Sequence, residues 1–146
     1  MRVTVLALQE LKSHLLRAGF EIYRAREDVV TIAERPRENL VMDSGVRVTL
    51  RPDGYVLRFV TRAERSAFPG EPDGAMFERA RDVLRRSVVR AFDEVEATAR
   101  TIQDPGDEAH TLDTWFEVVW ETLLVDEATL LEQVAFLMKL EKAATR

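Results

Sequence analysis

The chain has 146 residues, a net charge of −5 and no cysteine. This length favours a single domain, and the missing cysteine excludes disulfides, thiolate nucleophiles, iron–sulfur clusters and cysteine-based zinc sites. No segment approaches the roughly 20 apolar residues of a membrane span, and the apolar stretch after Met1 is too short for the core of a signal peptide. We therefore expect a cytoplasmic protein.

The first part of the chain, residues 1–62, predicts one helix followed by a four-stranded antiparallel meander. Leucines at helical spacing indicate a helix over about residues 4–18, which Gly19 would end by adopting a positive φ. The sequence Arg51-Pro52-Asp53-Gly54 is typical of a tight turn. Runs rich in β-branched and aromatic residues indicate strands over residues 20–23, 29–33, 46–51 and 55–62, with a loop over residues 36–43.

The second part, residues 75–146, predicts helices only. Apolar residues three to four apart indicate one long helix over residues 75–102, which Asp104-Pro105-Gly106 would end. A second helix would begin at a Thr111/Asp113 cap and a third near Asp126. These last segments are apolar on more than one face, so they need two packing partners, one of which could be a second copy of the chain.

The predicted fold is therefore α+β. It combines an N-terminal helix, a four-stranded antiparallel sheet and two or three long C-terminal helices packed on one sheet face. We expect one domain over residues 1–146, with the helix and sheet in residues 1–62 and the helical part in residues 75–146.

Charge is distributed unevenly along the chain. Residues 1–62 hold 11 basic and 8 acidic side chains, whereas residues 104–146 hold 3 basic and 10 acidic ones. A mildly basic first part joined to an acidic last part argues against simple wrapping of nucleic acid. It also makes electrostatic contact between complementary surfaces possible.

Arginines on the predicted hairpin are the first candidate for a binding surface. If the turn has four residues, Arg47 and Arg51 share a face with Arg58, and the other face carries a good apolar core. A three-residue turn would not separate the faces, and the hydrophobic pattern favours the first register. The four arginines of this surface are Arg47, Arg51, Arg58 and Arg62.

Three interpretations of this arginine surface remain open. It could be a solvated face that pairs with acids of neighbouring elements, or a surface that selects an acidic partner by complementarity. It could also bind RNA or a nucleotide, which would require aromatic side chains among the arginines to stack on bases. Tyr23 is the only strand aromatic that could join them.

An apolar and aromatic cluster in the predicted second helix is the other candidate for partner binding. Core packing explains such a cluster most simply, but tryptophan is also enriched at the energetic centres of protein interfaces. The residues of this cluster are Trp115, Phe116, Trp120, Leu123 and Leu124.

No motif for catalysis or for a cofactor occurs in the sequence, so we expect a non-enzymatic protein without a cofactor. The segment Asp104–Asp113 holds four carboxylates and His110, which could bind a divalent cation through oxygen ligands. It lacks the spacing of an EF-hand, and a solvated loop with helix-capping acids explains it as well. A small metal-dependent enzyme with its site in this segment is therefore an alternative.

The stretch Leu11–Ile22, followed by an acidic turn and Val29-Val30-Thr31-Ile32, resembles the helix–glycine–strand–strand start of type III secretion chaperones and their YbjN-type relatives. Members of that family are small, acidic, cytoplasmic α/β proteins that usually dimerise and bind extended segments of a partner protein. The family places further strands after its middle helix, whereas residues 75–146 here predict helices. The resemblance implies a homodimeric chaperone or adaptor with no catalytic residues.

Overall fold

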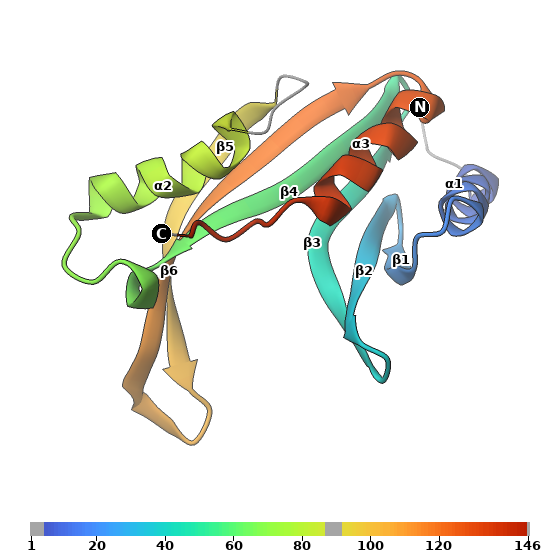
Figure 1. Ribbon diagram of the computed structural model, residues 1–146. Coiled ribbons are helices and arrows are strands. Elements are labelled where there is room, and N and C mark those ends of the chain that lie inside the picture. The colour runs from blue at the N-terminus through green and yellow to red at the C-terminus, as the bar shows by residue number, and fades with distance from the viewer. Residues whose placement is uncertain (1–4, 87–91, 146) are drawn as a thin grey trace. The chain divides into compact units, whose positions relative to one another are not determined.

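The fold combines three α-helices with a six-stranded sheet over the described residues, 5–86 and 92–145 of the computed structural model (Figure 1). The strands lie in the order β1-β2-β3-β4-β6-β5. The elements in chain order are α1 (Val5–Arg17), β1 (Ile22–Arg26), β2 (Val29–Arg37), β3 (Leu40–Arg51), β4 (Gly54–Glu64), a 3₁₀ turn (Arg65–Ala67), α2 (Asp73–Arg85), β5 (Asp93–Asp104), β6 (Asp107–Leu124) and α3 (Glu127–Lys139).

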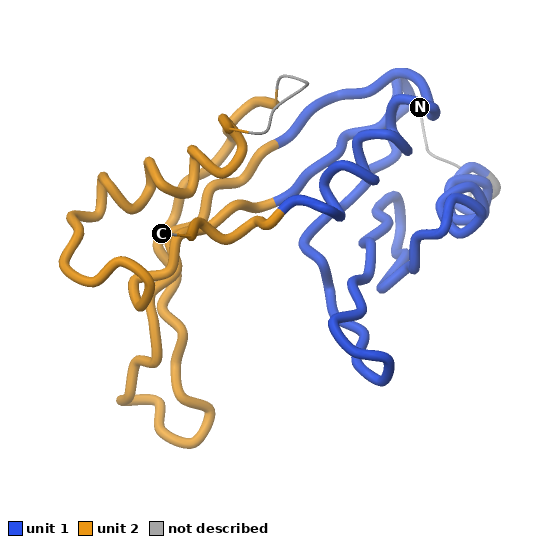
Figure 2. The backbone as a smooth tube through the Cα atoms, viewed as in Figure 1, with its two compact units in different colours: residues 1–59, 121–140 blue, residues 60–120, 141–146 orange. Residues whose placement is uncertain are grey.

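The chain divides into two compact units (Figure 2). Unit 1 takes its residues from 1–59 and 121–140, and unit 2 takes its residues from 60–120 and 141–146. Strands β4 and β6 each continue from one unit into the other. Each unit therefore combines sheet with helix, whereas the sequence suggested a sheet part followed by a helical part.

Unit 1 has its core between α1, α3 and one face of its strands. Directly paired residues of neighbouring strands point to the same face, and Val30, Val48 and Leu57 form such a series, all fully buried. The helices contribute leucines and valine at helical spacing to the same core: Leu11 and Leu15 from α1, and Leu130, Val134 and Leu137 from α3.

Three local predictions for unit 1 are confirmed. The first helix occupies Val5–Arg17, and Gly19 after it has a φ of 97°. Arg51 pairs with Gly54, so the turn has four residues, and the favoured register separates the arginines from the core. The last helix begins after Asp126, whose side chain caps it by accepting from the Thr129 N–H at 2.9 Å.

Unit 2 packs α2 against the second half of β4 and the middle of β6. Phe77 and Phe116 meet edge to face, with ring centroids 5.2 Å apart. A buried hydroxyl joins three elements, because the Trp120 Nε1–H donates to Thr61 Oγ1 at 2.9 Å and this hydroxyl donates to the Ala80 carbonyl at 2.7 Å.

The predicted long helix over residues 75–102 is wrong. Helix α2 ends at Arg85, and residues 93–104 form strand β5; residues 87–91 lie outside the described residues. Apolar residues are sparse in this segment. Val95 and Ala99, four residues apart, fit both the helical period and the strand period, whereas Ala97 between them fits only the strand period.

The predicted second helix, beginning at the Thr111/Asp113 cap, is also wrong. Residues 107–124 form the long strand β6. Phe116, Val118, Val119 and Trp120 are all buried, so the strand is covered on both faces around Val119. Such a strand gives a continuous apolar run that periodicity cannot distinguish from a buried helix, although its β-branched and aromatic content is typical of a strand.

The sheet therefore has six strands instead of the predicted four, and two helices of 13 residues, α2 and α3, replace the long C-terminal helices. The predicted loop over residues 36–43 is wrong as well, because β2 and β3 continue to a turn between Arg37 and Leu40. The pairing shifts between Glu34 and Arg37, and this irregularity accommodates Pro36, which has no N–H to donate.

Candidate functional site

A row of arginines crosses the sheet of unit 1 on the face opposite its apolar core. Strand pairing places Arg24 opposite Thr31, Thr31 opposite Arg47, and Arg47 opposite Arg58. Paired residues on one face lie about 5 Å apart, so these side chains share one strip that runs from β1 to β4. We call Arg24, Arg47 and Arg58 the arginine row.

Two members of the arginine row pair with nearby acids and stay partly exposed. The Arg47 Nη2 lies 3.8 Å from an Asp43 carboxylate oxygen, and its side chain is 51% exposed. The Arg58 Nη1 donates to Glu121 at 3.2 Å, and its side chain is 39% exposed. Exposed ion pairs of this kind are weak, so an incoming carboxylate can compete for these guanidinium groups.

Tyr23 lies beside the arginine row because the ladder between β1 and β2 shifts register between Ile22 and Arg24. This irregularity leaves both Tyr23 and Arg24 exposed, with the guanidinium 5.8 Å from the centre of the ring. An open cavity of about 340 Å³ forms here, and its lining includes Tyr23, Arg24, Arg26, Thr31, Asp43 and Arg47.

The other two arginines predicted for this surface have different surroundings. Arg51 is exposed and pairs with Gly54 at the turn of the β3–β4 hairpin. Arg62 belongs to unit 2, where its Nε donates to Glu64 at 2.8 Å. The predicted arginine surface therefore divides, with Arg47, Arg51 and Arg58 in unit 1.

Two arginine side chains of unit 2, Arg62 and Arg100, lie against the indole ring of Trp115. The guanidinium carbons of Arg62 and Arg100 lie 4.4 and 5.1 Å from the centre of its indole ring, within the range of cation–π attraction. Arg100 also donates to Glu117 at 2.8 Å. Two guanidinium groups and one carboxylate thus surround the half-exposed ring of Trp115. The sequence pattern does not single out Arg100.

The predicted apolar cluster does not form one surface. Successive side chains of a strand point to opposite faces, so Trp115 and Phe116 cannot lie together as they would on a helix. Phe116 and Trp120 are buried in unit 2, and Leu124 is buried in unit 1. Leu123 is 47% exposed. Of this cluster, Trp115 and Leu123 are the members that a partner could reach.

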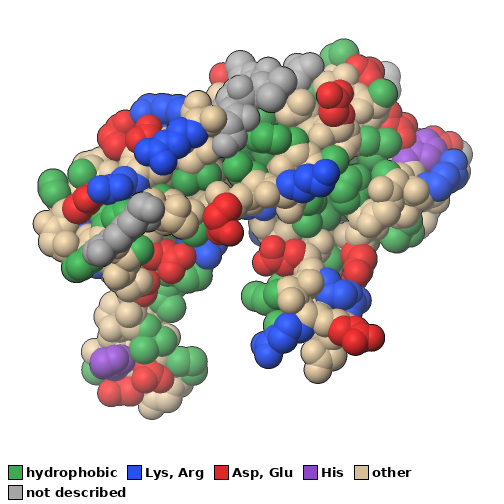
Figure 3. Space-filling view, in the orientation of Figure 1, with side chains coloured by type: hydrophobic (Ala, Val, Ile, Leu, Met, Phe, Trp, Pro, Cys, Tyr) green, Lys and Arg blue, Asp and Glu red, His purple; other side chains and the backbone are tan. Residues whose placement is uncertain are grey.

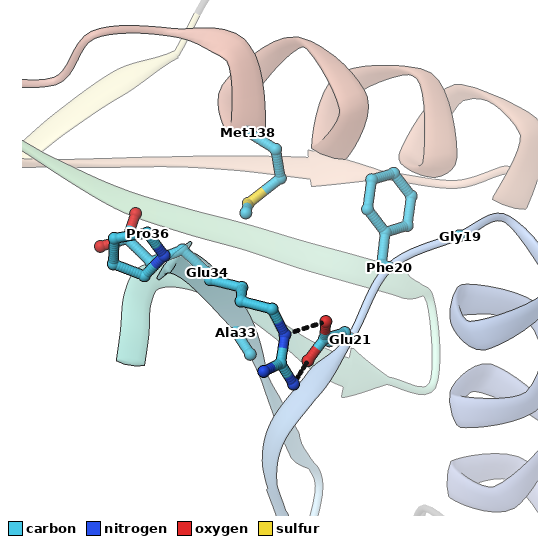
Figure 4. A pocket seen from close by; sticks show the side chains of 8 residues that line it. Gly19, Phe20, Glu21, Ala33, Glu34, Pro36 and Met138 are labelled. Atoms are coloured by element: carbon cyan, nitrogen blue, oxygen red, sulfur yellow. Dashed lines mark hydrogen bonds and ion pairs between the residues drawn. The ribbon is translucent and has the colours of Figure 1, made fainter. Parts of the chain in front are cut away.

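A second open cavity, of about 410 Å³, lies between the start of β1, β2 and α3 (Figure 4). Phe20 and Met138 line its apolar side, and Arg35 binds Glu21 across the other side through two hydrogen bonds of 2.8 and 2.9 Å. The hydrogen bond from Arg35 holds the pKa of Glu21 below its ordinary value. Because the Arg35 guanidinium already donates two hydrogen bonds to Glu21, this cavity is less suited to an acidic ligand than the arginine row.

The segment Asp104–Asp113 runs from the tip of the β5–β6 hairpin into β6, and acidic side chains gather at the tip (Figure 3). Asp104 and Asp107 accept hydrogen bonds from the backbone N–H groups of Gly106 and Ala109. Asp113 accepts from the Ser66 N–H at 3.0 Å and from its hydroxyl at 2.7 Å. Over residues 5–86 and 92–145, no group of three or more metal-binding side chains is close enough together to hold an ion.

The sequence pattern missed Arg24 because the strand that it predicts over residues 20–23 ends before this residue. The turn comprises only residues 27 and 28, and Arg24-Ala25-Arg26 alternates polar and apolar residues as the end of strand β1. This alternation was the available signal.

No protein-family model, curated protein or solved structure matches the chain. Within the part of the chain that the structure describes, no helix is long and apolar enough to cross a membrane.

Proposed function

We propose that the protein is a non-enzymatic binding module, of chaperone or adaptor type, that recognises an acidic segment of another protein through the arginine row. The observation that carries this proposal is the alignment of Arg24, Arg47 and Arg58 across the strands of unit 1 on a face that carries no apolar core. Like charges placed directly opposite each other cost stability, so a partner that supplies carboxylates gains from this arrangement.

The family resemblance of residues 1–62 supports the same function. Type III secretion chaperones and their relatives place further strands after the middle helix, and here α2 is followed by β5 and β6. This order of elements, with two strands after a middle helix, is what the resemblance implies and supports the proposal. The resemblance also makes the cytoplasm the compartment in which to look for the partner.

The experiment is affinity purification of the tagged chain from extracts of its source at moderate salt, followed by mass spectrometry. We expect one stoichiometric acidic protein with the unmodified chain, and its loss with the double variant Arg47→Glu, Arg58→Glu. The matched control is Arg17→Glu with Arg37→Glu, which makes the same charge change at exposed positions of unit 1. Equal recovery with both double variants would overturn the proposal.

RNA or nucleotide binding is the second candidate, because Tyr23 lies in the same cavity as Arg24 and Arg47 and could stack on a base. Glu27 and Asp43 in this cavity disfavour a polyanion. A salt-dependent change in anisotropy with labelled single-stranded oligonucleotides, lost in Tyr23→Ala, would favour this candidate over the protein partner.

Homodimerisation remains part of the proposal, at a different location. Only one of the two C-terminal helices first considered for it exists, because residues 107–124 form a strand and residues 127–139 form α3. In the sheet order β5 is a terminal strand, and its residues 93–101 are all exposed, so it could pair with β5 of a second copy. We expect a dimer in sedimentation equilibrium and a monomer for Val95→Lys with Ala99→Lys; a monomeric unmodified chain would contradict this.

A further inference from the structure

The C-terminal tail, Glu141–Thr145, lies beside β4 as a short extra strand. Ala143 forms a parallel bridge with Arg62. The Arg62 N–H donates to the Lys142 carbonyl at 2.9 Å, and the Ala144 N–H donates to the Arg62 carbonyl at 2.8 Å. The ladder between β3 and β4 ends with the pair Arg47–Arg58, so this part of β4 has room for another strand.

The side chains of the tail are all small or polar. Its sequence, Glu-Lys-Ala-Ala-Thr, contains no large apolar side chain that could anchor it in a core. The main-chain hydrogen bonds at Arg62 are of the kind by which an extended peptide of any sequence adds to a sheet. A competing strand with better side-chain contacts could therefore replace the tail.

The side chains around Arg62 indicate what such a strand would carry. Residues joined by a bridge point to the same face, so the side chain of Ala143 lies on the face of Arg62 and Trp115. The Arg62 Nε donates to Glu64, and the guanidinium carbon lies 4.4 Å from the centre of the Trp115 indole ring. A carboxylate-bearing side chain in place of Ala143 would lie on the same face as this guanidinium.

We propose that residues 60–64 of β4 form a strand-addition site for an extended, acidic segment of a partner protein, and that the chain's own tail occupies this site until the partner replaces it. The inference rests on the proposed function as a protein-binding module, but it concerns unit 2 and not the arginine row. The tail thus sets a threshold for binding, since a partner must compete with a tethered strand.

The test uses the full chain and one defined acidic probe, a fluorescent peptide with the sequence of residues 140–145 carrying Lys142→Glu and Ala143→Glu. Ala144→Pro removes the N–H that donates to Arg62 and should release the tail. Ala143→Pro is the matched control, because in a parallel bridge the Ala143 N–H points away from β4. We expect the peptide to bind the Ala144→Pro variant roughly tenfold more tightly than the unmodified chain or the control. Equal affinity for the three proteins, or binding to none, would overturn the proposal.

Hydrogen exchange of the Arg62 amide gives a second readout that does not depend on a proline variant folding normally. Replacing Ala143 by Glu in the full chain should strengthen the tail's contact with Arg62, slow exchange of this amide and weaken binding of the peptide roughly tenfold. Unchanged exchange and unchanged peptide binding would show that the tail does not occupy a recognition site. The extract experiment with Arg47 and Arg58 tests the proposed function separately, so its outcome can differ from this one.

Discussion

Arg47 and Arg58 lie directly opposite each other in the ladder between β3 and β4. Two like charges in this position repel each other and lower the stability of the hairpin. Asp43 and Glu121 reduce the repulsion, but both arginines stay more than one-third exposed. The repulsion between Arg47 and Arg58 lowers the stability of the fold, and a bound carboxylate would relieve it. This cost is consistent with a surface that binds carboxylates.

The first prediction is that Arg47→Glu raises the free energy of unfolding in an Asp43→Asn background, where the new carboxylate meets no like charge on residue 43. The new pair of Glu with Arg58 should add about 0.2–1 kcal/mol, while binding of the acidic partner falls. Urea denaturation measures the change. Arg51→Glu is the control, because its paired residue is Gly54, and it should stay within about 0.5 kcal/mol.

Much of unit 1 could be predicted because its signals are local. The φ of Gly19, the Asp126 cap and the four-residue turn at Arg51–Gly54 each depend on residues within a few positions. The register of this hairpin then follows, since a slip by one residue would expose Val48 and Leu57.

The second half could not be predicted in the same way because its strands depend on distant partners. Strand β6 becomes a strand by pairing with β4, more than 40 residues earlier in the chain, and its burial on both faces removes the alternation that identifies strands. The arginine row has the same origin. Arg24 joins Arg47 and Arg58 only through strand pairing, and a register shift at Ile22 decides which β1 side chains face outward.

The second prediction concerns Gly54, where the chain approaches the end of β6 very closely. A Cβ atom at this position would lie 2.4 Å from the Leu124 carbonyl oxygen, which belongs to the backbone and cannot move aside. Gly54→Ala should therefore lower the free energy of unfolding by more than about 1 kcal/mol. Gly106→Ala is the matched control, since a Cβ atom there would have the Asp104 Oδ1 as its nearest neighbour, at 3.5 Å. Equal effects in thermal melts would contradict this geometry.

The third prediction concerns the buried hydroxyl of Thr61, which accepts from Trp120 and donates to the Ala80 carbonyl. Thr61→Val keeps the shape of the side chain but removes the acceptor of the buried Trp120 N–H, at a cost of about 1–3 kcal/mol. The Ala80 carbonyl loses this hydrogen bond but keeps the one within helix α2. Thr61→Ser keeps the hydroxyl and should cost about 0.8 kcal/mol for the lost methyl group. If urea denaturation finds the valine variant as stable as the serine variant, the hydroxyl does not hold α2 on the sheet.

The fourth prediction is a pH dependence at Asp113, which joins β6 to the 3₁₀ turn after β4. Burial acts to raise the pKa of this carboxyl, but hydrogen bonds from Ser66, Thr114 and Trp115 outweigh it, so the pKa lies below its ordinary value of 3.8. A group whose pKa is lowered on folding stabilises the fold above its unfolded pKa, and this stabilisation is lost as the pH falls through the folded pKa.

Asp113→Asn should therefore lower the free energy of unfolding at neutral pH by about 1.5–3 kcal/mol, the usual value of hydrogen bonds to a charged group. The difference between the two proteins should shrink once the pH falls below 3.8, because the Asp113 carboxylate is then protonated and becomes uncharged like the amide of the variant. Urea denaturation at a series of pH values measures this difference, and the comparison removes the contribution of the other carboxylates. Asp107→Asn, at the exposed hairpin tip, is the control and should show little difference at any pH. A difference at Asp113 that stays constant into the acidic range would mean that its charge does not hold the 3₁₀ turn to β6.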